Sequence, residues 1–177
     1  MLECVKLVHN ALPEINLDNI DTSISFLGHR FSAPILIDSM TGGTAKGGQI
    51  NSILSSVAEE LGLGMGVGSQ RAGLRSEKLS ETYKIVRKNA PSIFLAANIG
   101  GAQLSQGLTI KDAKNLIDMI DANALIVHLN PLQELIQPEG EPESEKVLQS
   151  ICDLVEKVNV PVIIKEVGSG ISKEVAI

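Results

Sequence analysis

Five short aliphatic runs, each followed by a longer stretch of mixed polarity, dominate the sequence from residue 33 onward. The runs occupy residues 33–40, 63–69, 92–100, 124–130 and 161–167. An apolar strand followed by a helix-length segment, repeated in this way, is typical of βα units, which build parallel sheets covered by helices. We therefore predict an α/β protein with five parallel strands.

The stretches between the runs carry helical signals. We expect helices at about residues 47–61, 76–89, 109–120 and 143–158, and a long polar loop at 132–146. In the first helix, apolar residues recur at three- and four-residue intervals, at Ile50, Ile53, Leu54, Val57 and Leu61. This spacing puts one apolar stripe on the helix.

The βα units recur every thirty to forty residues, which is the spacing of a (β/α)8 barrel. A complete barrel takes about 250 residues, whereas this sequence of 177 residues stops at GISKEVAI, just after the fifth strand. We expect a TIM-barrel type of fold in which about the first five βα units are present, as one partial domain over residues 1–177. Residues 1–32 would form a lid or plug, and residues 33–177 the strands and helices.

Composition narrows the choice of ligands and partners. The interior must be aliphatic, because 44% of residues are hydrophobic but there is no Trp, one Tyr and three Phe. A formal charge of −6 argues against nucleic acid and anionic membranes as partners, although a local cationic cluster could still bind a small anion. Cys4 and Cys152 show no metal-binding or redox spacing, so we expect reduced, packed thiols. No run could span a membrane and no signal peptide is evident, so we expect a cytoplasmic protein.

The loops that follow the carboxyl ends of barrel strands form the active site, so polar residues at these five points are the candidates. In DSMTGGT, Gly42 and Gly43 would let backbone N–H groups approach a ligand beside Thr41, or would only make a tight turn. In GVGSQR, Ser69 is available, and Arg71 could clamp a phosphate or pair with a neighbouring loop.

Two further candidates are polar residues inside apolar strands. Asn98 in AANIG must find hydrogen-bond partners, which a flavin or other heterocycle could supply, or it holds a loop. Lys165 in IIKEV would be costly to bury without an anion, so it faces a cofactor edge or a carboxylate.

The end of the fourth predicted strand, HLNPLQE, concentrates four polar side chains. His128 and Asn130 are two residues apart and share one face of the strand, while Val127 and Leu129 point to the other. Gln133 and Glu134 follow directly. Glu134 could hold Mg²⁺, which takes one or two carboxylates together with ligand phosphates, or could be a solvated loop carboxylate.

These strings resemble type 2 isopentenyl diphosphate isomerase, particularly its archaeal members, from about Leu7 onward. The resemblance is carried by DSMTGG, MGVGSQR, AANIG, HLNPLQE and IIKEVGSGIS, in this order. It implies an FMN-dependent enzyme of isoprenoid biosynthesis that uses Mg²⁺, with NADPH as the flavin reductant. Such an enzyme interconverts isopentenyl and dimethylallyl diphosphate. It also implies a small diphosphate substrate and a homo-oligomer.

The resemblance implies a role for each matching position. Contacts to FMN would come from Met40, Thr41, Gly42, Ser69, Asn98 and Lys165. The substrate diphosphate would be bound by Arg71, His128 and Asn130. Gln133 would be the catalytic residue at the alkene and Glu134 would bind Mg²⁺. Because glutamine is a poor acid and base, the reduced flavin would handle the protons while Gln133 orients or relays.

Two departures and two alternatives accompany this resemblance. The family begins with an RKxDH-like segment that MLECVKLVHN does not match, and its FMN-phosphate loops would lie beyond Ile177. We therefore expect a chain that is shortened at both ends and weakly active or inactive by itself. The alternatives are another FMN-dependent TIM-barrel oxidoreductase and a non-catalytic half-barrel that pairs its open edge strands with another copy.

Overall fold

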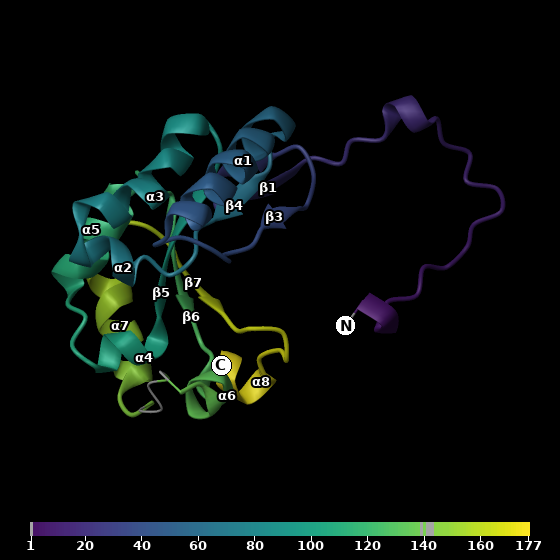
Figure 1. The fold of residues 1–177 in the computed structure, drawn as a ribbon. Coiled ribbons are helices and arrows are strands. Elements are labelled where there is room, and N and C mark those ends of the chain that lie inside the picture. Colours follow the sequence, from purple (N-terminus) through teal and green to yellow (C-terminus); the bar gives the residue numbers. More distant parts are fainter. Residues whose placement is uncertain (1, 139, 141–143) are drawn as a thin grey trace.

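Five parallel strands form one sheet in sequence order, β3-β4-β5-β6-β7 (Figure 1). The computed structural model describes residues 2–138, 140 and 144–177. The strands are β3 (Leu36–Ile37), β4 (Gly64–Gly66), β5 (Leu95–Gly100), β6 (Ala124–His128) and β7 (Val162–Lys165). Each lies within one of the five predicted runs and every neighbouring pair is parallel. The eight-stranded barrel stays a prediction.

The longer helices lie together on one side of this sheet (Figure 1). They are α1 (Ala45–Leu61), α3 (Glu77–Asn89), α5 (Ile110–Met119) and α7 (Val147–Lys157). All four were predicted, but α7 begins later than residue 143, because Lys146 adopts a left-handed backbone conformation at its N-cap. Residues 141–143 lie outside the described residues.

Short helices follow the strands, and the first three were not predicted. Three of them begin within a few residues of a strand end: α2 (Arg71–Arg75), α4 (Gly101–Ser105) and α6 (Pro131–Ile136). A fourth, α8 (Lys173–Ala176), lies near the end of the chain. Helix α6 occupies the start of the segment predicted as a polar loop, and Pro131 at its first turn presets the helical φ angle.

Most of the apolar stripe predicted for α1 does not face the core, and only Leu54 of its five residues packs against the core. Ile53 is 65% exposed, and Ile50, Val57 and Leu61 are exposed too. The buried positions of α1 are instead small or polar, at Gly47, Asn51, Ser55 and Ala58. The reason is the close approach of α3: a Cβ on Gly48 would lie 3.2 Å from the Thr82 Cβ, and the Asn51 amide donates to the Thr82 carbonyl over 3.0 Å.

The two faces of the sheet bury different residues because side chains alternate along each strand. Leu95, Ala97 and Ile99 of β5 point into the large cluster under the helices, as do Leu125 and Val127 of β6. The residues between them point to the other face, where the smaller cluster contains Phe31, Phe94, Ala96, Ala124 and Ile126. The predicted separation of Val127 from His128 is thereby confirmed, whereas Leu129 and Asn130 follow the end of β6 and line one smaller pocket together.

The sheet is strongly curled. Strands β3 and β7 are its opposite edges, and in a flat sheet they would lie about 19 Å apart at the usual strand spacing. The Lys165 Nζ, at the end of β7, nevertheless lies 3.4 Å from an Asp38 carboxylate oxygen just after β3. Only a curled sheet brings these side chains together, so the carboxyl ends of all five strands surround one mouth.

The segment before the sheet contains a hairpin of β1 (Ile24–Phe26) and β2 (His29–Phe31), and two turns of 3-10 helix, Leu2–Cys4 and Leu17–Asn19. The rings of Phe26 and Phe31 pack against Phe94 at centroid distances of 5.6 Å each, near the amino end of β5. Residues 3–20 are exposed and lie apart from the sheet (Figure 1). A lid or plug role for residues 1–32 stays a prediction.

Both cysteines lie at the surface of the molecule. Cys4 and Cys152 are free, as predicted, but both are exposed rather than packed, because Cys4 lies in the N-terminal segment and Cys152 on the outer side of α7. Among the described residues, no helix is both long and apolar enough to cross a membrane.

Candidate functional site

A pocket of about 220 Å³ lies at the carboxyl ends of the five strands, and we call it the strand-end pocket. Seven of the eleven predicted site residues line it: Met40, Ser69, Asn98, His128, Asn130, Gln133 and Lys165. They come from the ends of all five strands, which the curl of the sheet brings together. The pocket is therefore built in the way that the βα pattern predicts for a ligand site.

Lys165 and His128 supply cationic character to this pocket. Lys165 is mostly buried, and its ammonium group pairs with Asp38 and donates to the Glu166 carbonyl over 3.4 Å. Of the two partners expected for the buried charge of Lys165, a cofactor edge or a carboxylate, the carboxylate is thus present. In the β6–β7 register His128 is the direct partner of Lys165, so both side chains emerge on the same face.

The His128 ring is held in place by Asn98. The ring Nδ1 lies 2.7 Å from the Asn98 side-chain oxygen. Burial lowers the pKa of His128, the positive charge of Lys165 lowers the same pKa further, and the negative charge of Glu134 acts in the opposite direction. His128 is therefore biased towards the neutral form unless an anion binds beside it.

Two buried hydroxyls have no hydrogen-bond partner among the described residues. They belong to Ser39 and Ser69, and both residues line the strand-end pocket. A buried hydroxyl without a partner is costly, so a ligand with polar atoms would satisfy these two. Sequence reasoning missed Ser39, Gly68 and Val167 as lining residues, although Ser39 lies inside the DSMTGG string.

The TGG turn has a packing role instead of lining the strand-end pocket. A Cβ on Gly42 would overlap the Tyr83 ring, and the Gly43 N–H donates to the Thr82 hydroxyl over 2.9 Å. The Thr41 carbonyl accepts from the Gly68 N–H over 3.1 Å. The sequence allowed either a ligand-binding turn or a simple tight turn, and these contacts are those of a tight turn. A contact of Thr41 or Gly42 with FMN stays a prediction.

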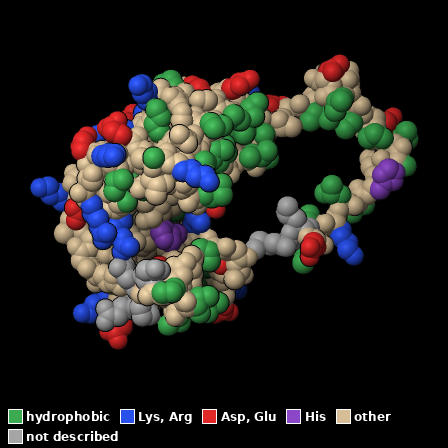
Figure 2. All heavy atoms as spheres, in the orientation of Figure 1, with side chains coloured by type: hydrophobic (Ala, Val, Ile, Leu, Met, Phe, Trp, Pro, Cys, Tyr) green, Lys and Arg blue, Asp and Glu red, His purple; other side chains and the backbone are tan. Residues whose placement is uncertain are grey.

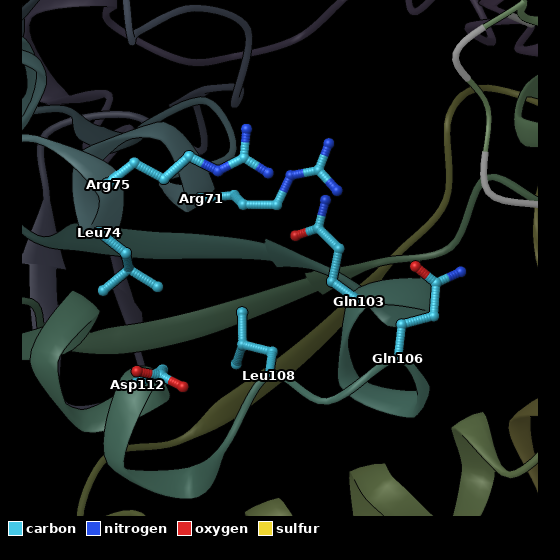
Figure 3. A pocket seen from close by; sticks show the side chains of 7 residues that line it. All are labelled: Arg71, Leu74, Arg75, Gln103, Gln106, Leu108 and Asp112. Atoms are coloured by element: carbon cyan, nitrogen blue, oxygen red, sulfur yellow. The ribbon is translucent and has the colours of Figure 1, made fainter.

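Arg71 lines a separate pocket, which we call the Arg71 pocket (Figure 3). It has a volume of about 320 Å³ and lies between α2, α4 and the start of α5. Arg71 and Arg75 are one helical turn apart, and both guanidinium groups extend in the direction of Gln103. Gln103 is close to His128, since both contact the position of a Cβ built on Gly100, so the two pockets are neighbours.

Glu134 lies outside the strand-end pocket too, in a smaller pocket of about 140 Å³ with Leu129, Asn130 and Val147. The Asn130 amide donates to a Glu134 carboxylate oxygen over 2.8 Å. Within the described residues, no group of three or more His, Cys, Asp or Glu side chains could hold a metal ion. A cation at Glu134 would therefore need most of its ligands from elsewhere.

Gln70 is a buried residue whose function the sequence did not reveal. Its side chain is fully buried, accepts from the Asn98 N–H over 3.0 Å and donates to the Leu116 carbonyl over 3.1 Å. A buried glutamine with both ends of its amide satisfied fixes the backbone around it. Here it ties the end of β4 to β5 and α5.

The fold and the strand-end pocket define a class: parallel α/β proteins with a polar pocket at the carboxyl edge of a curled sheet. No protein-family model matches the chain. The chain is, however, similar to proteins named isopentenyl-diphosphate delta-isomerase. It is 52% identical over 175 residues to that of Rickettsia prowazekii (strain Madrid E), which covers 99% of this chain and 51% of the relative.

Similar relatives come from other organisms. The isopentenyl-diphosphate delta-isomerases of Metallosphaera sedula and Ignicoccus hospitalis are each 46% identical, over 177 and 173 residues. These matches cover 99% and 98% of this chain, and 48% of each relative. The chain spans about half the length of the curated relatives that it matches.

These similarities correct the family interpretation. The strand-end motifs predict a type 2, archaeal-like enzyme that is shortened at both ends. This prediction is wrong. The relatives share a name that specifies no type, and those from the bacterium Rickettsia are 51–52% identical, above the 46% of Metallosphaera sedula. Because up to 99% of the chain is matched, the similarity also includes the opening segment that was expected to differ.

Proposed function

We propose that the chain carries part of the active site of an isopentenyl-diphosphate isomerase, which interconverts isopentenyl and dimethylallyl diphosphate. The supporting observation is that the residues expected to bind an anionic ligand gather in the strand-end pocket of a chain that is 46–52% identical to proteins of that name. The reaction adds a proton at one carbon and removes a proton from another, so it needs no net oxidation or reduction.

FMN fits the strand-end pocket as a cofactor. Its polar ring edge would satisfy the two unpartnered hydroxyls of Ser39 and Ser69, and Lys165 would neutralise negative charge on it. Met40 and Asn98 line the same pocket. When bound and reduced by NADPH, FMN would supply the proton donor and acceptor for the alkene.

The diphosphate would lie beside His128 and Asn130, with Arg71 approaching from the neighbouring pocket. A guanidinium group can bind two phosphate oxygens at once. Mg²⁺ usually takes one or two carboxylates together with phosphate oxygens, so Glu134 alone could hold it once the diphosphate is bound. The hydrogen bond from Asn130 holds the Glu134 carboxylate beside the diphosphate-binding groups.

Gln133 would orient the reacting carbons. It lines the strand-end pocket at the first turn of α6, and its neutral amide can donate and accept without adding charge near an alkene. Because glutamine is a poor acid and base, its replacement should slow turnover more than it weakens diphosphate binding.

The test uses the full-length protein that carries this sequence, supplied with FMN, NADPH, Mg²⁺ and isopentenyl diphosphate. Formation of dimethylallyl diphosphate, followed by proton NMR, is expected. The variant His128→Gln should lose most of this activity, and His9→Gln should keep it because His9 is exposed in the N-terminal segment. A flavin-loaded protein that forms no product, or that instead oxidises a hydroxy acid, would refute the proposal and favour the oxidoreductase alternative.

A further inference from the structure

Two buried side-chain amides lie in series behind His128. Gln70 is fully buried and Asn98 is 1% exposed. The backbone of each bonds to the other residue, since the Gln70 N–H donates to the Asn98 carbonyl and the Asn98 N–H donates to the Gln70 side-chain oxygen, both over 3.0 Å. These bonds fix the backbone at Asn98, from which its side chain extends towards His128, and they involve no ligand.

This fixed amide sets the proton arrangement on the imidazole. The Asn98 side-chain oxygen, 2.7 Å from His128 Nδ1, can only accept, so this contact is a hydrogen bond when Nδ1 carries the proton. In the neutral ring the other nitrogen, Nε2, is then the one without a proton. Free imidazole side chains favour the opposite tautomer, so the arrangement is imposed by the protein.

The β5–β6 register explains why the ring reaches Asn98. The residue of β5 directly opposite His128 is Gly100, and Asn98 lies two residues earlier on the same face of β5. A Cβ built on Gly100 would lie 3.1 Å from His128 Nε2 and 3.2 Å from the Gln103 amide carbon. Glycine thus leaves room for the ring to lie over β5, with Nε2 beside the Gln103 amide.

We propose that Gln70 and Asn98 are positioning residues that hold His128 with its Nδ1–H on Asn98, so that Nε2 is presented beside Gly100 and Gln103 to a phosphate group. That this phosphate belongs to an isoprenoid diphosphate rests on the proposed function. The orientation of the ring does not, because it follows from hydrogen bonds that the folded chain makes by itself.

The charged groups around the ring suit this role. Lys165 faces His128 from β7 and Glu134 acts on it from α6, while the partners from β5, the Asn98 side-chain amide and the Ile99 backbone, are neutral. A carboxylate at Asn98 would form an ion pair with the ring and hold it permanently cationic. A neutral acceptor fixes the orientation but leaves the second proton to be taken up when an anion binds at Nε2.

The first measurement is nitrogen-15 NMR on the full-length protein with labelled histidine. We expect His128 at neutral pH with a protonated Nδ1 and an unprotonated Nε2, whereas exposed His9 serves as an internal reference for the free-tautomer pattern. A His128 signal with the proton on Nε2 would overturn the proposal, since the Asn98 amide would then donate to the ring. No catalytic activity is needed for this readout.

Variants then identify which side chains impose the tautomer. Asn98→Ala should release the ring into the free-tautomer pattern, whereas Asn98→Asp should keep the proton on Nδ1 and raise the pKa of His128. Gln70→Met should shift the tautomer partway. A matched control is Asn89→Ala, because the Asn89 amide lies at the end of α3 and donates to Ser52 of α1, away from His128. An unchanged His128 signal in folded Asn98→Ala or Gln70→Met would remove the role assigned to that residue.

Inorganic pyrophosphate provides the binding test. It should shift the Nε2 signal of His128 in the natural protein, and Asn98→Ala should weaken binding about fivefold, the effect of one ordinary hydrogen bond. Gly100→Ala should also weaken binding, because its Cβ would crowd Nε2. Pyrophosphate binding that leaves Nε2 unchanged would overturn the proposal. If the Nε2 shift is seen but no isoprenoid product forms, only the proposed function fails.

Discussion

The burial of His128 should make the stability of the fold depend on pH. Its pKa is lowered in the folded chain, first by burial and then by Lys165, so the unfolded chain binds a proton more readily. The free energy of unfolding should therefore be highest above about pH 6.5, the ordinary pKa of histidine, and fall as the pH drops below it. Urea unfolding between about pH 7.5 and 5.5 measures this.

The variant His128→Gln isolates that contribution. It removes the titrating group, so its free energy of unfolding should change less over the same pH interval than that of the natural protein. The aspartate and glutamate carboxylates with lowered pKa, such as Glu59 and Asp112, act only at lower pH. Equal pH dependence in both proteins would show that another group controls stability in this interval.

Single residues also show where sequence reasoning succeeds. Asn98 and Lys165 could be predicted as pocket residues because strand ends are recognisable and the ends of parallel strands converge, whereas Met40 was predicted only through the family resemblance. Gln70 could not be recognised as a positioning residue, since its partners Asn98 and Leu116 are 28 and 46 residues away in the sequence. Contacts of this kind depend on tertiary packing, which one sequence does not display.

At the scale of elements, alternation of side chains made the strands predictable, whereas short helices escaped detection. Helices α2 and α4 have only five residues each, too few for a helical period to show. The sequence revealed the apolar stripe of α1 but not that most of this stripe is exposed. The exposed apolar side chains gather where α1, β1 and β3 lie (Figure 2), so periodicity located the helix without locating its buried face.

The reversed burial of α1 leads to an expected difference between two substitutions. Ile53→Gln should change the free energy of unfolding by less than about 0.5 kcal/mol, because this side chain is largely exposed. Ala58→Leu should lower it by about 1–3 kcal/mol, because Ala58 is fully buried and its extra carbons have no room. Urea unfolding compares the two variants, and a larger loss for Ile53→Gln would mean that the stripe is covered in solution.

For the whole molecule, the curl of the sheet connects fold and site. The ion pair of Lys165 with Asp38 joins the two edges of the sheet across its mouth. Asp38 is more than half exposed, so this pair contributes little to stability. Its consequence is positional, because it keeps the Lys165 ammonium group at the mouth of the strand-end pocket.

The same curl leaves two open edges, from which we predict self-association of the 177-residue chain when it is prepared alone. Within the described part of the chain, β3 and β7 each pair with a strand on one side only. Exposed apolar side chains lie beside the β3 edge, including Ile35, Leu36 and the α1 stripe. Unpaired strand edges and apolar surface both favour association with another copy.

Sedimentation equilibrium over a range of protein concentrations measures this association. Leu36→Lys should weaken it, because a charge on an edge strand opposes pairing of that edge with another strand. The matched control is Leu148→Lys, an exposed leucine on α7, a helix that packs against α4 and not at the β3 edge, which should leave the association unchanged. A chain that stays monomeric at every concentration would contradict the prediction. Equal weakening by both substitutions would place the contact away from the β3 edge.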